Sequence, residues 1–326
     1  MTINERSSST THVQKVDFET HLDRLFNDAE ATAGLFGRRS MVWEVGRESI
    51  VVLGGGRAAL LQLAHPYIAH AIHQHSTVLS DIQGRFQRTL STMFAMTFGD
   101  RAEALRLARK IYAIHRGVTG EIRGDVGRFS DGHKYSALQI DAMFWVAATL
   151  WDTSILIFEA TVRRLTPIEK EQYYQETKTF CRLFGIPSGA IPDTWVDFRR
   201  YFQDMLTSDT LAIDETARAL AQRVLQPTRP SAQPMYAWLE TFTASLLPRR
   251  FRSGFGLPTH RGVDVMGRGS LLALKRGLSF LPHGIRYCPA YLRTNRRLSG
   301  RDGHDQLALL WRRLVLALLK QTGKRE

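Results

Sequence analysis

Hydrophobic residues recur at every third or fourth position in nearly every stretch between the glycines and prolines of this chain. This spacing is typical of helices that bury one face, whereas strands alternate apolar and polar positions. No series of alternating stretches is present. The pattern predicts an all-α protein built as a single large helical domain, and its early helices are expected over residues 21–37, 54–76, 81–100 and 101–120.

The second half of the chain contains the most apolar stretch, residues 141–165, which predicts a central buried helix that stops near Pro167. Thr166 and Glu169 have the spacing of a capping box, so a helix is expected over residues 166–185. A loop rich in proline and glycine follows, and residues 194–206 begin the next helix. Short helices are expected beyond residue 245, with a terminal helix over residues 305–326.

Neither a membrane span nor a signal peptide is expected. The apolar window from Ala142 to Phe158 is shorter than the roughly 20 residues that a span requires, and it contains Asp152. The first twelve residues lack a basic start followed by an apolar core. The sequence therefore predicts a cytoplasmic protein.

The two cysteines, Cys181 and Cys288, lie far apart and have no CxxC or CxxCH partner. This argues against a disulfide framework, a zinc site and covalently attached haem. No GxSxG motif is present, and neither cysteine has a histidine at motif spacing, which makes a hydrolase a poor interpretation.

The net charge of +13 lies entirely in the last quarter of the chain. Residues 245–326 contain 17 Lys and Arg but four acidic residues, while the preceding residues contain 27 of each sign. We predict a flexible N-terminus over residues 1–15, a helical core over residues 16–244, and a basic helical extension over residues 245–326 that packs on the core. Such an extension can meet nucleic acid, an anionic membrane or an acidic partner. The absence of interleaved aromatics and of a recognition-helix motif argues against nucleic acid.

One histidine interrupts the apolar stripe of the helix expected over residues 101–120. The stripe consists of Leu105, Ala108, Ile111, His115 and Val118. A histidine on such a face is either a core residue hydrogen-bonded to a carbonyl or a functional group, as a ligand or a catalyst. Gly117 and Gly120 would let a bulky group approach the backbone beside His115.

A second candidate lies in the helix expected over residues 81–100. Arg85 and Thr89 are one turn apart and share a face, and Arg88 is their neighbour. The face is either a solvated basic surface or a partly buried one. Bulky apolar residues nearby favour burial, and a partly buried arginine requires an anion such as a carboxylate or phosphate of a ligand.

Four histidines, His65, His70, His73 and His75, cluster before this helix. His70 and His73 are one turn apart and could share a metal, but no HExxH, no ExxH and no nearby carboxylate completes a site. Packing and hydrogen bonding are the favoured roles, with one of these histidines as a candidate for lining a pocket.

Several segments in order resemble one family. They are LQLAHPYIAHAI, GRFQRTL, FGDRAEALRLARKIYAIHRGVTG, YSALQIDAMFWVAATLWDT, FGIPSGAIPDTWVDFRRYF and LLPRRFRSGFGLP. Together they resemble the MpaB oxygenase and rubber oxygenase (latex-clearing protein) family over about residues 40–290. The order and spacing of the motifs carry this resemblance, because each motif alone is weak.

The resemblance implies an all-helical fold with a globin-like core around a non-covalent haem b, and a reaction of dioxygen with isoprenoid double bonds. The family's axial histidine matches His115 in HRGVTG, which would make His115 the iron ligand. The element near the haem matches Arg85, Arg88 and Thr89, which would lie near the haem or its propionates.

The chain also departs from this family. The rubber-cleaving members use a distal glutamate, and the corresponding stretch, HPYIAHAIHQHS, contains no carboxylate. His70 and His73 are the candidates for the distal polar group. The resemblance therefore implies a haem b-dependent oxygenase with a hydrophobic, isoprenoid or lipid-like, small-molecule substrate other than polyisoprene.

The partners that this interpretation allows are an electron donor, a second subunit and a membrane surface that contacts the basic extension. Two other classes stay open. One is a non-catalytic haem- or lipid-binding helical protein, and the other is a basic-patch protein that binds membrane or nucleic acid.

Overall fold

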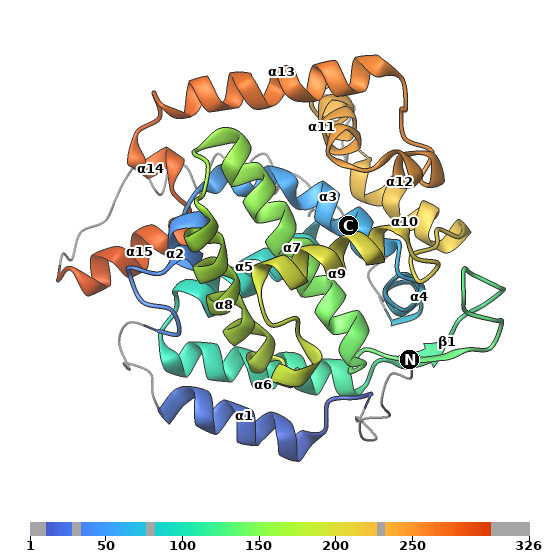
Figure 1. Cartoon of the computed structure of the whole chain (residues 1–326), viewed down its shortest axis with the longest axis horizontal. Helices are drawn as coiled ribbons and strands as arrows, with labels where there is room; N and C mark the ends of the chain where they lie inside the picture. Colours follow the sequence, from blue (N-terminus) through green and yellow to red (C-terminus); the bar gives the residue numbers. More distant parts are fainter. Residues whose placement is uncertain (1–10, 28–33, 76–81, 227–231, 301–326) are drawn as a thin grey trace, which may run out of the picture.

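The computed structural model describes residues 11–27, 34–75, 82–226 and 232–300, and helices form nearly all of their regular structure (Figure 1). Within these residues the one sheet is an antiparallel pair of three-residue strands. The all-α prediction is therefore confirmed. In chain order the elements are α1 (Lys15–Asn27), α2 (Met41–Gly46), η1 (Ser49–Gly54), α3 (Gly55–Leu63), α4 (Pro66–His75), α5 (Ile82–Phe98), α6 (Arg101–Arg116), β1 (Thr119–Glu121), β2 (Lys134–Ser136), α7 (Ile140–Thr161), α8 (Pro167–Leu183), η2 (Ser188–Ala190), α9 (Trp195–Thr207), α10 (Glu215–Leu225), α11 (Gln233–Leu246), α12 (Arg249–Gly254), α13 (Arg261–Leu278), α14 (His283–Arg286) and α15 (Pro289–Leu298).

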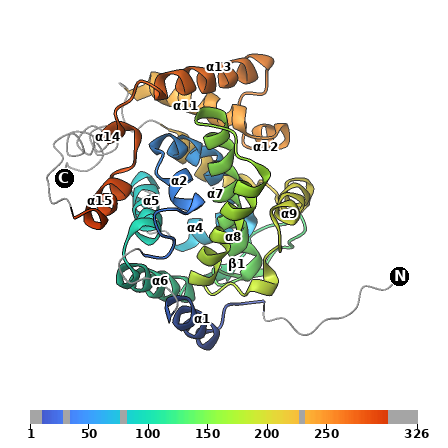
Figure 2. The ribbon, with the colours of Figure 1, turned by 60° about the vertical axis from the view of Figure 1, so that its left-hand side comes forward.

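Helix α7 lies in the centre of the fold, as the apolar pattern predicted (Figures 1 and 2). Trp145, Ala148, Ile157 and Phe158 are fully buried, and α2, α3, α8, α13 and η1 all pack against the helix. Helix α7 is long and apolar enough to cross a membrane, but the buried core helix of a protein meets the same criteria of length and composition. It ends at Thr161, four residues before the predicted end, because the chain turns there toward the start of α8.

A carboxylate of α7 is paired inside this core. The side chain of Asp152 is 5% exposed, and its Oδ2 accepts a hydrogen bond of 2.6 Å from Nη2 of Arg57 in α3. Arg199 of α9 pairs with Oδ1 of the same carboxylate. A buried charge is tolerated when it is paired and hydrogen-bonded. Asp152 thus joins three helices that are far apart in the sequence.

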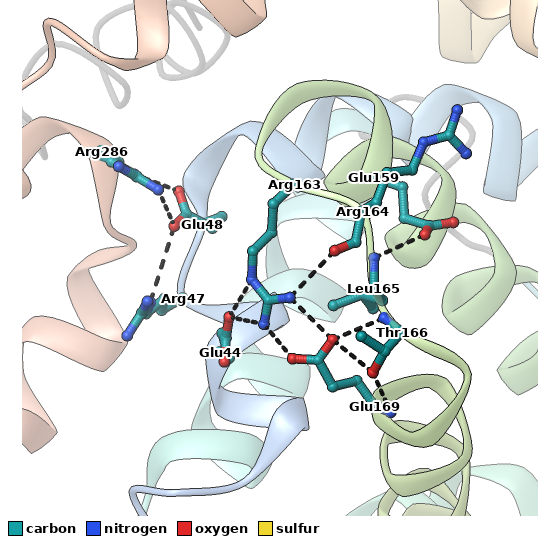
Figure 3. A network of polar contacts seen from close by, with 10 residues as sticks. All are labelled: Glu44, Arg47, Glu48, Glu159, Arg163, Arg164, Leu165, Thr166, Glu169 and Arg286. Carbon is teal, nitrogen blue, oxygen red and sulfur yellow. Dashed lines mark hydrogen bonds and ion pairs between the residues drawn. The ribbon is translucent and has the colours of Figure 1, made fainter.

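An ionic network fixes the exit of α7 (Figure 3). Arg163 donates to Glu44 of α2 at 2.6 Å and to Glu169 of α8 at 2.8 Å. Glu169 also closes the capping box with Thr166, which the sequence predicted correctly. Hydrogen bonds from Arg163 and from Thr166 lower the pKa of Glu169 to about 2.

The described part of the basic extension packs on the preceding helices. Glu48, just before η1, is buried and accepts two hydrogen bonds of 2.8 Å from Arg286 (Figure 3). The amide of Cys288 donates to the carbonyl of Arg47 at 2.7 Å. Helix α13 packs on α11 and α7, and α15 packs on α5. The terminal helix predicted over residues 305–326 lies outside the described residues.

The first predicted helix, residues 21–37, is wrong in its position. Helix α1 begins earlier, at Lys15, and residues 34–36 form a turn. Gly34 and Gly37 both have φ of +71°, a left-handed conformation that does not continue a right-handed helix. The helix predicted over residues 54–76 is divided at Pro66 into α3 and α4, because proline has no amide hydrogen to donate within a helix.

Residues 11–14, at the end of the segment predicted to be flexible, contact the loop before α7. The amide of Val13 donates to the carbonyl of Leu138 at 3.0 Å, and the amide of Ile140 donates to the carbonyl of Thr11 at 3.0 Å. Val13 is buried. Residues 1–10 lie outside the described residues. Both cysteines are buried and form no disulfide.

We expect Asp152→Asn to lower the free energy of unfolding by about 3 kcal/mol, because Arg57 and Arg199 would lose the carboxylate that compensates them. Chemical denaturation measures the change. The matched control is Asp197→Asn, which breaks an exposed ion pair with Arg200 and should have a much smaller effect. Equal stability of Asp152→Asn and the parent would show that the buried carboxylate does not hold these helices together.

Candidate functional site

Predicted site residues lie at three helix ends, the end of α4, the start of α5 and the end of α6, and α4 packs on the β-hairpin. Only Gly99 and Asp100 separate α5 from α6, which pack together and run in opposite directions (Figure 1). The end of α6 therefore lies level with the start of α5. We call the last turn of α4 (residues 72–75), the first turns of α5 (residues 82–89) and the last turn of α6 (residues 112–116) the three-helix junction.

Side chains of α4 fix it to β1, which begins three residues after α6 ends. The ring of His75 donates from Nε2 to the carbonyl of Thr119 at 2.7 Å. The amide of Gln74 donates to the carbonyl of Glu121 at 2.7 Å, and its oxygen accepts a hydrogen bond of 2.8 Å from Tyr135. These bonds hold the ends of α4 and α6 close together.

His115 lies in the last turn of α6 and is partly buried. The helix is buried at Ala104, Leu107 and Ala108, and its stripe becomes more accessible toward the carboxyl end. Ile114, next to His115, is 55% exposed. The carbonyls at a helix end carry negative partial charge, so this position favours a cation near the imidazole.

The two glycines near His115 differ in their surroundings. A Cβ on Gly117 would meet only the carbonyl oxygen of Ile114, at 3.6 Å, so this side of the backbone has space. A Cβ on Gly120 would collide with Gln74 and Tyr135. Packing of α4 on β1 therefore explains Gly120, and only Gly117 leaves room of the kind that the sequence suggested.

The face of α5 that carries Thr89 is open to solvent. Thr89 and Arg88 are both exposed, which agrees with the solvated basic surface that the sequence left open and not with the burial that the nearby apolar residues favoured. Among the α5 side chains that the structure describes, the buried ones, Met96 and Phe98, lie at its other end, near α2 and α15. Arg85 lies within α5, but its side chain is outside the described residues.

The histidines of α4 have different surroundings. His70 is buried, whereas His73 and His75 are exposed, so His70 and His73 do not share one environment. Across the described ranges, no three His, Cys, Asp or Glu side chains are grouped so that they could hold a metal ion. A metal held by side chains alone is therefore not supported in that part of the chain.

The structure brings a carboxylate to His70 that sequence reasoning missed. Nε2 of His70 lies 2.9 Å from Oδ2 of Asp214, and the other oxygen of Asp214 accepts from the amide of Ala217 at 2.8 Å. Burial raises the pKa of Asp214, but hydrogen bonds from His70 and Ala217 outweigh this and lower it. Asp214 could be recognised in the sequence as a helix N-cap, but its pairing with a histidine 144 residues away could not.

His65, at the start of α4, lies in an aromatic cluster on the loop between β1 and β2. Its ring centroid is 5.1 Å from that of Tyr67 and 6.0 Å from that of Phe129. Its Nδ1 accepts from the amide of Tyr67 at 3.3 Å, and its buried Nε2 has no hydrogen-bond partner. Burial lowers the pKa of His65 to about 4, so the ring is neutral at pH 7.

The donors at the three-helix junction suit a haem. A haem iron takes four nitrogens from the porphyrin and requires one axial protein ligand, for which a single imidazole is sufficient. His115 would supply this group, next in sequence to the exposed Ile114 and close to the open side of Gly117. The hydroxyl of Thr89 and the cation of Arg88 could contact anionic groups at its edge.

A family model described as the ER-bound oxygenase mpaB/B'/Rubber oxygenase, catalytic domain, matches residues 43–276, more than two thirds of the chain. The matched region contains α4, α5, α6 and α7 and extends beyond residue 245 into α13. Neither the curated proteins nor the solved structures contain a significant match.

Because of His65, we expect the free energy of unfolding to decrease as the pH falls from about 6.5 to about 4. Above pH 6.5 the ring is neutral in both states, but below it the unfolded chain binds a proton that the folded chain excludes. His65→Asn keeps an acceptor for the amide of Tyr67 and should weaken the pH dependence in this window. Denaturation at several pH values tests this, with the exposed His73→Asn as control. An unchanged slope in His65→Asn would contradict it.

Proposed function

Because the chain belongs to the mpaB and rubber oxygenase family and carries its oxygenase catalytic domain, we propose that it is a haem b-dependent oxygenase. Its substrates are dioxygen and a hydrophobic small molecule of isoprenoid or lipid-like character. The proposal treats the three-helix junction as the place where the haem binds. The proposed reaction also includes an electron donor as a partner of the protein.

One observation carries this proposal. His115 is a partly buried imidazole at the end of α6, inside the matched region, and it lies beside an exposed isoleucine and a glycine with open space. A core histidine would instead be surrounded on all sides by packed side chains. A nitrogen of His115 would hold the haem iron, and the negative end of α6 would favour the charge on the metal.

The exposed face of α5 has a positioning role in the proposal. The guanidinium of Arg88 and the hydroxyl of Thr89 hold anionic groups of the haem or polar groups of the substrate. Arg85, one turn before Thr89, joins them in this role. Haem iron, when bound, supplies the binding and activation of dioxygen.

The proton-handling group of the proposal is His70, with His73 as the second candidate. Asp214 contacts Nε2 of His70 and fixes the orientation of the ring. In this role Nδ1 would carry the exchanged proton, because Asp214 contacts Nε2 of this buried ring. In this pair a carboxylate orients a histidine, and Asp214 of the loop before α10 provides the carboxylate that the sequence of α4 lacks.

We expect the purified protein to bind added haem and to show the absorption spectrum of histidine-ligated iron. His115→Ala should lose this spectrum, because the iron would lose its axial ligand. The matched control is His260→Ala, which removes an exposed histidine at the start of α13. Absence of haem binding by the parent protein, or an unchanged spectrum in His115→Ala, would overturn the proposed cofactor site.

Oxygen consumption separates an oxygenase from a non-catalytic haem-binding protein. With haem and a reductant supplied, a hydrophobic isoprenoid substrate should accelerate oxygen uptake, and a product containing oxygen should appear. A ligated spectrum without any uptake across a panel of apolar substrates would support the non-catalytic alternative.

A further inference from the structure

Helix α13 presents an outward face on which basic and apolar side chains alternate. The exposed residues of this face are Arg261, Val265, Arg268, Leu272, Lys275 and Arg276. They are three or four residues apart, or adjacent at the last pair, and therefore share one side of the helix. We call them the α13 stripe. Phe280 and Leu281 follow the helix and are 86% and 41% exposed.

The opposite face of α13 is already occupied by the protein. Val263 and Leu278 are buried, and a Cβ on Gly267 would collide with Ser245 of α11. Ser270 accepts a hydrogen bond of 3.0 Å from Trp238 of α11. With its inner face packed on α11 and α7, the helix runs along the edge of the molecule (Figures 1 and 2). The residues of the α13 stripe are exposed.

Exposed apolar side chains are concentrated here. Of the nine large apolar side chains that are exposed among the described residues, four lie within residues 265–281. The other five lie one each on the five helices α1, α6, α8, α9 and α11. Scattered apolar residues on a surface are ordinary, but a cluster of them marks a binding surface.

Among the described residues no carboxylate forms an ion pair with the α13 stripe, although Asp264 interacts electrostatically with Arg268. The stripe contains four cations and no carboxylate. The one acid of α13, Asp264, lies at its flank and pairs with the buried Arg252 at 2.7 Å. Arg286 and Arg250 of the same extension are committed to Glu48 and to backbone carbonyls, respectively. The α13 stripe is therefore a surface on which cations are available to an outside anion.

We propose that the α13 stripe, with Phe280 and Leu281, is a docking surface for an anionic lipid membrane. A helix that lies in the plane of a membrane inserts apolar side chains between the headgroups while its basic residues contact anionic lipids. Val265, Leu272 and Phe280 match the first requirement, and the four cations match the second. A nucleic acid would use the cations but not the exposed aliphatic side chains between them.

We expect the full chain to sediment with vesicles of phosphatidylcholine that contain phosphatidylserine, and not with phosphatidylcholine alone. Binding should fall as salt increases. Arg268→Ala with Lys275→Ala should lower partition by about 30-fold, because each basic residue near an anionic surface contributes about fivefold. Leu272→Ser with Phe280→Ser should lower it by about tenfold through the loss of apolar insertion.

The matched control is Arg106→Ala with Lys110→Ala. It removes two exposed cations one turn apart on α6, on the opposite side of the molecule, and changes the net charge equally (Figure 1). This variant should bind vesicles within about twofold of the parent. Thermal melts followed by circular dichroism should show that all three variants are folded, because every altered side chain is exposed.

Three results would overturn this proposal. One is failure of the parent to bind anionic vesicles at low salt, and another is equal binding by the stripe and control variants. The third is evidence that the α13 stripe binds a partner other than a membrane. In that case the parent would form a dimer that Phe280→Ser dissociates, or would bind a DNA or RNA duplex through the stripe cations, without binding vesicles. None of these measurements requires haem, so they are independent of the proposed reaction.

Discussion

Helix α7 is apolar on almost every side and must be covered on every side. It has 22 residues, more than half of which are buried, so no single partner helix is sufficient. Helices from both halves of the chain surround it, including α3 from the beginning and α13 from the basic extension. The positions of these helices follow from the need to remove the apolar surface of α7 from water.

Ionic contacts then determine how the covering helices are arranged. Asp152 of α7 pairs with Arg57 and Arg199, while Glu48 pairs with Arg286. Apolar contact is not directional, but a buried carboxylate is compensated only when a cation reaches it in one geometry. These contacts define which helix lies beside which. Some arginines of the basic extension, such as Arg286, therefore stabilise the fold through ion pairs, while other cations are exposed on the surface.

The same arrangement produces the candidate site and the docking surface on different sides of the molecule. In the three-helix junction the β-hairpin holds the end of α4 near the end of α6, α5 packs on α6, and the groups come from a short span of sequence. The α13 stripe exists because only one side of α13 packs on the core. If both proposals hold, a lipid-like substrate and a lipid surface would meet one protein at two places that the fold keeps separate.

Local pattern was sufficient to predict much of this protein. Periodicity indicated the helical class and the central helix, and the Thr166 and Glu169 spacing located a helix start correctly, because these features depend on neighbours a few residues apart. Motif order indicated the family that the domain match then established, and the roles of His115, Arg85, Arg88 and Thr89 stay predictions.

Only the tertiary structure decided the surroundings of individual side chains. It separated His70 from His73, brought Asp214 to His70 and used Gly120 for packing rather than for a cofactor. It also showed which cations of residues 245–300 are exposed. The sequence records which groups are present and how they repeat along one helix. Burial and pairing depend on segments far apart in the sequence, 144 residues for His70 and Asp214, and the distances between such segments are set only when the helices pack.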